Sequence, residues 1–248
     1  MKIIAITNQK GGTGKTTTAI NLGCALASMG KNILLIDLDP QANLTYSFGI
    51  TPQKGTMADV LQAKSTLSTI FTKKENVTIA PSSTTLADVE LSMVSRVGRE
   101  RILKDCLKSL KGFDYAFIDC PPSLSVLTVN TFNAAQEVLI PTQVEILSLQ
   151  GLAQLLNTIK EVKQVLNSNL KIMGIIPSLY DARRRLSEEV LKEIAKNMKE
   201  RIFKTPIREC VKIAEAPSFA KSVLAYAPRS HGAEDFIALA KEFLKYEK

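Results

Sequence analysis

The chain has 248 residues, of which 45% are hydrophobic and 23% charged, a balance typical of a folded globular protein. The formal net charge is +8 and unevenly placed: residues 1–150 carry 14 basic and 12 acidic side chains, and residues 151–248 carry 18 and 12. No stretch approaches the ~20 apolar residues of a membrane span, and the apolar run after Met1 is too short for a secretory signal. The basic surplus leaves three interpretations open: a nucleic-acid partner, an anionic membrane or a solvated lysine-rich surface.

Short aliphatic runs alternate with longer segments of helical period along the chain. We predict strands at residues 2–7, 32–37, 77–80, 114–119, 137–141 and 171–177. We predict helices at residues 15–29, 99–111, 149–167, 186–201 and 233–245. Nearly continuous apolar strands separated by helices indicate a mostly parallel sheet covered on both faces. The sequence therefore predicts a doubly wound α/β fold, with residues 1–248 forming a single domain.

Cysteine and histidine limit the chemistry that the chain can perform. The four cysteines show no C-x-x-C pair and no zinc spacing; they are Cys24, Cys106, Cys120 and Cys210. Free thiols without a secretory signal indicate a reducing, cytoplasmic environment. The one histidine, His231, argues against a histidine-based metal site or catalytic triad.

A glycine-rich segment directly follows the first predicted strand and opens the first predicted helix. In that context backbone N–H groups converge on phosphate oxygens at a helix N-terminus. We expect the Lys15 ammonium to reach the β- and γ-phosphates and the Thr16 hydroxyl to ligate Mg²⁺. Gln9 occupies the position where the strict G-x-x-x-x-G-K-[ST] pattern has its first glycine, and Lys10 is a second lysine within the segment. The candidate phosphate-binding residues are Lys10, Gly11, Gly12, Thr13, Gly14, Lys15, Thr16 and Thr17.

Three aspartates stand at or just beyond the carboxyl ends of two predicted strands, where ligands bind in open α/β sheets. One of Asp37 and Asp39 could hold the water shell of a metal while the other orients an attacking water. A turn or capping role before Pro40 is the alternative. Asp119 ends an apolar strand, as expected of a carboxylate that binds Mg²⁺ through a water.

The segments K-G-G-T-G-K-T-T, L-I-D-L-D-P-Q-A-N and F-I-D-C-P-P-S resemble the deviant Walker A ATPases, and among them the ParA/Soj partition proteins. Later segments are similar to the same proteins: Val144-Glu145, Leu149 to Leu152, Tyr180 to Arg183 and Glu215 to Ser218. The resemblance spans nearly the whole chain in order. It implies ATP and Mg²⁺ as cofactors.

The resemblance also implies roles for individual residues. Lys10 matches the lysine that reaches across an ATP-sandwich homodimer to the partner's nucleotide, where a cation supplied in trans stabilises the transferring phosphoryl group. Asp39 matches the aspartate that positions the hydrolytic water, so Lys10, Lys15 and Asp39 are the expected catalytic residues. Asp37 and Asp119 match the carboxylates near Mg²⁺.

The segment Pro206-Ile207-Arg208 falls where the family's adenine-contacting loop lies. Arg208 stands in place of the usual asparagine, so a side-chain contact with the base stays open, whereas a backbone contact does not depend on that residue. Pro206 and Arg208 are therefore the expected base-contacting positions.

Ten basic residues lie between positions 183 and 212: Arg183, Arg184, Arg185, Lys192, Lys196, Lys199, Arg201, Lys204, Arg208 and Lys212. The resemblance implies DNA contact at Arg183, which Arg184 and Arg185 extend, and Lys212 is a further candidate. Contacts of this kind with phosphates carry no sequence information, so we expect non-specific binding of double-stranded DNA. We expect ATP dependence because only a dimer aligns two weak patches. The alternative is that several of the lysines pair with glutamates along one helix, which leaves the arginine triplet unexplained.

The family resemblance implies a role in bacterial chromosome or plasmid partition. It implies slow ATP hydrolysis that a ParB-type partner accelerates, a cytoplasmic and nucleoid-associated location, and no stable membrane association. The sequence starts at the first predicted strand, so the N-terminal helix-turn-helix extension of long plasmid ParA proteins is not expected. Site-specific operator binding is not expected either.

Three alternatives share parts of this pattern. A MinD-like membrane-cycling ATPase has the same phosphate loop but ends in an amphipathic membrane tail, whereas the apolar stripe of residues 233–245 resembles core. An electron-transfer ATPase like the nitrogenase iron protein needs paired cluster ligands, and Cys120 has no evident second ligand. A nucleotide-dependent scaffold with negligible hydrolysis would not depend on Asp39.

Overall fold

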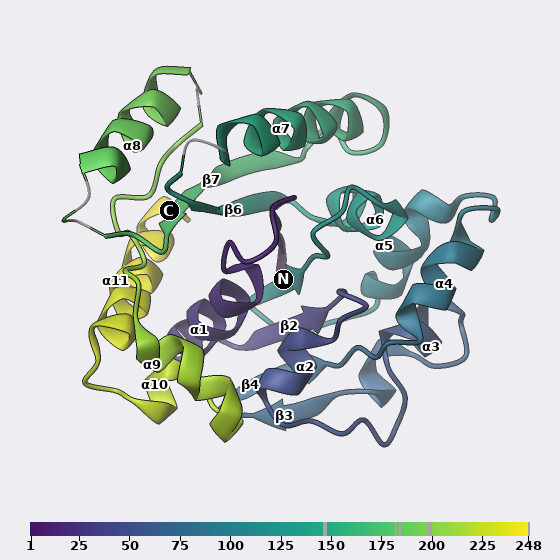
Figure 1. The fold of residues 1–248 in the computed structure, drawn as a ribbon. Helices are drawn as coiled ribbons and strands as arrows, with labels where there is room; N and C mark the ends of the chain where they lie inside the picture. Colours follow the sequence, from purple (N-terminus) through teal and green to yellow (C-terminus); the bar gives the residue numbers. More distant parts are fainter. Residues whose placement is uncertain (146–147, 182, 184, 198–199, 248) are drawn as a thin grey trace.

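The computed structural model describes residues 1–145, 148–181, 183, 185–197 and 200–247 (Figure 1). Within these residues, seven strands form one sheet in the order β3-β4-β2-β5-β1-β6-β7. Their bounds are β1 (Lys2–Ile6), β2 (Ile33–Asp37), β3 (Thr72–Lys74), β4 (Val77–Ala80), β5 (Tyr115–Asp119), β6 (Glu137–Gln143) and β7 (Lys171–Ser178). All neighbouring pairs are parallel except β3–β4, which is antiparallel. The predicted mostly parallel α/β sheet is thereby confirmed.

Helices cover both faces of this sheet. Figure 1 shows α1 and α11 on one side of the sheet and α4, α5 and α6 on the other. The helix bounds are α1 (Lys15–Ser28), α2 (Asn43–Ser47), α3 (Met57–Leu61), α4 (Leu86–Met93), α5 (Ile102–Leu107), α6 (Val126–Ala134), α7 (Ser148–Val165), α8 (Arg185–Asn197), α9 (Val211–Glu215), α10 (Val223–Tyr226) and α11 (His231–Tyr246). The described part of the chain also has the short 3-10 helices η1 (Leu67–Thr69), η2 (Arg99–Arg101) and η3 (Ala216–Phe219).

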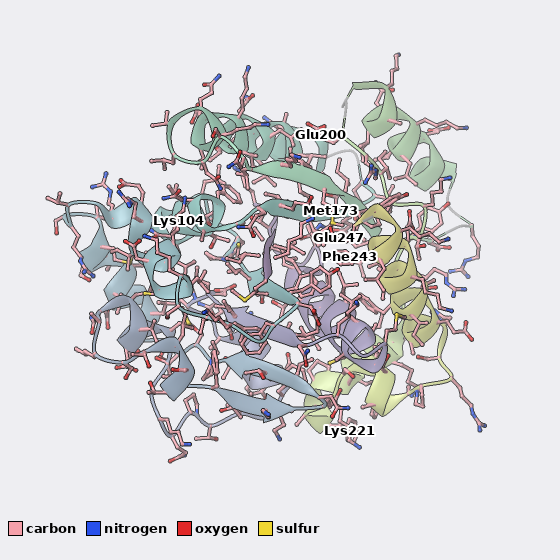
Figure 2. All side chains as sticks on the ribbon, turned by 180° about the vertical axis from the view of Figure 1, so that it is seen from behind. Lys104, Met173, Glu200, Lys221, Phe243 and Glu247 are labelled. Atoms are coloured by element: carbon pink, nitrogen blue, oxygen red, sulfur yellow. The ribbon has the colours of Figure 1, made fainter. Side chains whose placement is uncertain are left out.

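Each strand supplies two core layers because successive side chains point to opposite faces. On β5, Ala116 and Ile118 belong to the core layer that contains the buried residues of helices α3 to α8. Tyr115 and Phe117 belong to the other layer, which contains the buried residues of α1 and α11. Figure 2 shows Phe243 on α11, viewed from behind. Its ring centroid lies 5.2 Å from that of Tyr115 and 5.8 Å from that of Phe117. This aromatic cluster fixes α11 against the sheet.

The six predicted strands are found within two residues of their expected ends, and four of the predicted helices are recovered as α1, α7, α8 and α11. The helix expected at residues 99–111 is wrong in form, because it is split into η2 and α5 and ends at Leu107. The helix expected to continue to Arg201 is described as far as Asn197, and residues 198–199 lie outside the described residues. Arg201 is not helical, and its carbonyl accepts a hydrogen bond from the Ile175 N–H at 2.8 Å.

The parallel register brings the carboxyl ends of three strands together. Asp37 on β2 aligns with Asp119 on β5, and Asp119 aligns with Ile6 at the end of β1. The glycine-rich segment leaves β1 at this same edge. The fold therefore places the candidate phosphate loop beside two of the three candidate aspartates.

Candidate nucleotide-binding site

The glycine-rich loop joins β1 to α1 through backbone conformations that favour glycine. Gly12 has φ +74° and Gly14 has φ +86°, and Gly14 is the N-cap of α1. Side chains other than glycine rarely adopt this left-handed region. Gly14 has no side chain that could cap α1, so the amide groups of the first turn are available to an anion.

Neighbouring strands hold the loop in place. The Ser178 hydroxyl at the end of β7 donates to the Thr13 carbonyl at 2.7 Å. The side-chain Nδ2 of Asn8 donates to the Pro141 carbonyl at 2.8 Å, and the side-chain Oδ1 of Asn8 accepts the Lys10 backbone N–H at 3.1 Å. The carboxyl ends of β6 and β7 therefore buttress the loop, which the sequence pattern alone did not indicate.

A cavity of about 700 Å³ opens beside this loop. One part is lined by Gly11, Gly12, Gly14, Lys15, Thr16 and Thr17, together with Asp39. The other part is more apolar and includes Ile207, Val211, Ile213, Pro217 and Phe236. A polar end that fits phosphates and an apolar end that fits a base are what a nucleotide requires.

The two lysines of the loop have different surroundings. Lys15 is buried, and its ammonium donates to the Lys10 carbonyl at 3.3 Å. Burial lowers the pKa of Lys15, although the charges of Asp119 and Asp39 oppose that shift. Lys10 lies outside the cavity lining, and its ammonium forms a 2.7 Å ion pair with Glu145 just after β6.

Asp119 is a fully buried carboxylate whose two oxygens have no hydrogen-bond partner among the described residues. Burial raises its pKa well above the ordinary value, and the charge of Asp37 adds to the shift. The nearby Thr16 hydroxyl and Lys15 ammonium act in the opposite direction. An unpartnered buried carboxylate is costly unless it binds a cation, so Asp119 and Thr16 offer the oxygen donors that suit Mg²⁺.

Asp37 is equally buried but already has three donors. Its Oδ2 accepts the Thr45 N–H at 2.8 Å and the Thr45 hydroxyl at 2.6 Å, and its Oδ1 accepts the Asp39 N–H at 3.3 Å. Burial raises the pKa of Asp37 to about 6 in spite of these bonds. Asp37 thus differs from Asp119, because hydrogen bonds from this chain occupy both of its oxygens.

Asp39 lines the cavity, whereas Asp37 does not belong to the lining among the described residues. The Oδ1 of Asp39 accepts the Gln41 N–H at 2.9 Å. Burial raises the pKa of Asp39, opposed by the Gln41 N–H and the Lys15 charge. The two aspartates therefore have separate surroundings, one inside the protein and one at the cavity.

At the apolar end of the cavity, Arg208 is fixed by Asp235 of α11. Its guanidinium Nη2 lies 2.6 Å from Asp235 Oδ1, and its backbone N–H donates to Asp235 Oδ2 at 3.0 Å. Arg208 lines the cavity, whereas Pro206 is not among the described lining residues. Cys210 and Tyr46 also line it, and the sequence reasoning missed both.

The residues predicted to contact DNA lie on separate segments. The Arg183 side chain is 91% exposed and bonds Asp181 through two nitrogens at 2.9 and 3.0 Å. Arg184 lies outside the described residues, and Arg185 begins α8. Lys212 on α9 pairs with Glu215 at 2.8 Å. Figure 1 shows α8 and α9 as separate helices, away from each other in that view.

Three features define the class as P-loop nucleotide-binding proteins: a glycine loop between a strand and a helix, a buried carboxylate on the adjacent strand and a two-part cavity.

Similarity to known proteins shows the family. A profile described as AAA domain matches residues 1–172. The chain is 44% identical over 246 residues to the sporulation initiation inhibitor protein Soj of Bacillus subtilis, covering 97% of both chains. It is 40% identical to the chromosome partitioning protein ParA of Caulobacter vibrioides, covering 100% of this chain and 96% of that one. The chain belongs to the Soj/ParA family of chromosome-partitioning ATPases.

Solved structures agree with the fold. The crystal structure of cobyrinic acid a,c-diamide synthase from Mycobacterium smegmatis with bound ADP and magnesium is 37% identical, with a TM-score of 0.88 over 99% of this chain and 95% of that one. The cell division ATPase MinD of Pyrococcus furiosus is 29% identical, with a TM-score of 0.81 over 98% of both. The MinD alternative thus has less support than the partition family. Within the described part of the chain, every helix is too short or too polar to cross a bilayer.

Proposed function

We propose that this protein binds ATP with Mg²⁺ in the cavity and hydrolyses it to ADP and phosphate. The observation that carries the proposal is the buried carboxylate of Asp119, near Thr16 and Lys15 of the glycine loop, whose oxygens have no hydrogen-bond partner among the described residues. A related structure that holds ADP and magnesium adds support. The family of the chain is also one of ATPases.

The loop residues Gly11 to Thr17 would bind the phosphates through backbone N–H groups and the Lys15 ammonium. Thr16 and Asp119 would hold Mg²⁺, and Asp37 would lie behind them without a free oxygen. The bound cation supplies charge neutralisation at the phosphates. Asp39 lines the cavity and is the group that would orient the attacking water.

Lys10 and the segment 206–208 complete the proposed nucleotide site. In the isolated chain Glu145 holds the Lys10 ammonium, so Lys10 must leave that ion pair to reach the nucleotide of a second copy in a homodimer. Arg208 would contact the base end from its fixed position against Asp235, and Pro206 remains a base-contacting candidate through its backbone.

We further propose that the ATP-bound dimer binds double-stranded DNA without sequence preference on the nucleoid. A ParB-type partner would release it by stimulating slow hydrolysis. Support comes from the family, from the basic surplus of residues 151–248 and from the exposed Arg183. Arg184, Arg185 and Lys212 are the other candidate contacts, since phosphate contacts need only accessible cations.

The test compares nucleotide states. We expect retention of the protein on plain duplex DNA with ATP but not with ADP or without nucleotide, and a steep loss of retention as salt increases. We expect no ATP-dependent pelleting with anionic vesicles. ATP-dependent pelleting without DNA retention would instead support the MinD-like alternative. ATP turnover that stays unchanged on adding the cognate ParB-type protein and DNA would contradict the proposed partner.

A further inference from the structure

A buried chain of hydrogen bonds connects three elements behind the cavity. It runs from Asp37 at the end of β2, through Thr45 on α2, to Ser82 just after β4, and returns to Asp39. Each of these residues is less than a tenth exposed. None of the motifs recognised in the sequence includes Thr45 or Ser82.

The Thr45 hydroxyl is the centre of this chain. It donates to Asp37 Oδ2 at 2.6 Å and accepts the Ser82 N–H at 2.8 Å. The Thr45 N–H donates to the same Asp37 oxygen at 2.8 Å. A backbone N–H can only donate, so the Thr45 hydroxyl accepts the hydrogen bond from Ser82 and donates its own proton to Asp37. The direction of each hydrogen bond in the chain is therefore fixed.

Asp39 is held through its backbone on both sides. Its N–H donates to Asp37 Oδ1 at 3.3 Å, and its carbonyl accepts the Ser82 hydroxyl at 2.9 Å and the Ala42 N–H at 2.9 Å. Ala42 has φ +52°, a left-handed conformation that a residue with a Cβ rarely adopts and that the surrounding contacts must hold. The loop that carries Asp39 is therefore held by Thr45 and Ser82 in addition to the hydrogen bonds within residues 37–42.

We infer that Thr45 and Ser82 are positioning residues for Asp39 in ATP hydrolysis. The inference rests on the proposed function, because it assumes that Asp39 orients the water. Neither Thr45 nor Ser82 lines the cavity among the described residues, so neither contacts the phosphates. Loss of either hydroxyl should lower the rate of the chemical step while leaving ATP affinity nearly unchanged, because a small displacement of a catalytic group reduces rate steeply.

The experiment uses the full chain and measures three quantities: the single-turnover rate of phosphate release from Mg²⁺·ATP, the dissociation constant for ATP, and the melting temperature. Thr45→Val removes the hydroxyl with little change in shape, and Thr45→Ser keeps it. Ser82→Ala removes only the bond to the Asp39 carbonyl, because the Ser82 N–H remains. Thr131→Val on α6 is the matched control, since Thr131 is also buried and donates to a backbone carbonyl, that of Leu127.

We expect the rate to fall about tenfold or more in Thr45→Val and several-fold in Ser82→Ala, the range typical when a positioning contact is lost. The Thr45→Ser and Thr131→Val variants should keep the rate within about threefold, and the ATP dissociation constant should change by less than about threefold in all four. A Thr45→Val or Ser82→Ala variant that melts no lower than Thr131→Val but turns over more slowly supports positioning.

The inference is overturned if Thr45→Val and Ser82→Ala both keep the wild-type rate, if Thr45→Ser loses as much rate as Thr45→Val, or if the losses in rate match those in ATP affinity. Should Thr45→Val fail to fold, Ser82→Ala decides the question, because it removes one bond. A wild-type protein that binds ATP without releasing phosphate would refute the proposed hydrolysis and this inference together. Normal wild-type hydrolysis with unaffected variants refutes the inference alone.

Discussion

Replacement of Asp119 by asparagine should change the stability of the free and the nucleotide-bound protein in opposite directions. The carboxylate of Asp119 is fully buried, and neither of its oxygens has a hydrogen-bond partner among the described residues. A buried polar group without a partner costs about 1–3 kcal/mol, and a charged one costs more. An amide of the same shape removes the charge, so the free Asp119→Asn protein should be more stable than the wild type.

The magnitude can be followed in the melting temperature. The asparagine amide still carries the cost of a neutral buried group, so the gain is only the additional cost of the charge. For a chain of about this size, each 1 kcal/mol of that gain raises the melting temperature by about 2–4 °C. Ligand at a hundred times its dissociation constant stabilises a protein by about 2.7 kcal/mol. Because Asp119 is expected to hold Mg²⁺, this gain with Mg²⁺·ATP should be present in the wild type and largely lost in the variant.

The assay is thermal unfolding of both proteins with and without Mg²⁺·ATP, and ATP without Mg²⁺ is the control for binding that does not need the metal. Cys120→Ala at the neighbouring buried position is the matched variant, since it perturbs the same strand end without removing a charge. A free Asp119→Asn protein that melts lower than the wild type, or one that retains the full stabilisation by Mg²⁺·ATP, would refute the reasoning.

Three further predictions address other parts of the molecule. Lys15→Gln should reduce ATP affinity by at least about a hundredfold, because the buried ammonium is the loop's charged contact to the phosphates; unchanged affinity in calorimetry would contradict the phosphate-loop assignment. Arg183→Glu should weaken retention on DNA while leaving the melting temperature within about 2 °C, because an exposed ion pair contributes little to stability; an unfolded variant would show that Arg183 is structural. Glu242→Gln should destabilise the protein by about 1–3 kcal/mol at pH 7, because this carboxylate accepts the N–H groups of Lys204 and Thr205. Burial opposes ionisation of Glu242, but these bonds and the Tyr246 hydroxyl lower its pKa below the ordinary 4.5. The stabilisation by the Glu242 carboxylate is therefore complete above pH 4.5 and is lost as the pH falls through the lowered pKa. A difference in urea midpoint between the wild type and Glu242→Gln that persists at about pH 3 would contradict this.

Hydrophobic periodicity was sufficient to predict the central strands but not the short elements. Strands β1, β2 and β5 are nearly continuous apolar runs, because both of their faces are covered. Strand β3 has only three residues, two of them lysines, and forms the antiparallel edge where charge is tolerated. Its pattern carries no apolar signal, so periodicity could not predict it.

Helix α2 shows a different limit of sequence reasoning. Its five residues, N-L-T-Y-S, have no strong helical pattern, and it begins after Ala42 in the left-handed region. The Asp37 carboxylate and the Thr45 N–H fix its position, and these groups meet only in the folded chain. A helix that depends on a tertiary contact leaves little trace in local propensity.

The candidate site could be predicted where chemistry depends on contiguous residues and not where it depends on distant ones. The glycine loop, Lys15, Thr16 and the three aspartates follow from short motifs next to strands. The base end follows only from the family resemblance, which gives Pro206 and Arg208, because the wall from Ile207 to Val211 is placed by a bridge between Tyr180 and Arg208 and by Asp235 on α11. A serine at the end of a predicted parallel strand, Ser178, is the one weak signal for the loop's support.

The same strand ends explain why the site should respond to a cation. Asp37, Asp39 and Asp119 each have a raised pKa, with burial as the largest cause, and the charge of one aspartate raises the pKa of another. The charges of Asp119 and Asp39 favour the charged form of Lys15, yet its ammonium bonds the Lys10 carbonyl, and both Asp119 oxygens are without a hydrogen-bond partner among the described residues. The free protein therefore keeps an electrostatic cost at this edge of the sheet, since unpaired buried charge is unfavourable. A divalent cation bound with the nucleotide would relieve that cost, so binding energy and folding stability would be linked at Asp119, while the hydrogen bonds of Asp37 to Thr45 and Asp39 would stay in place.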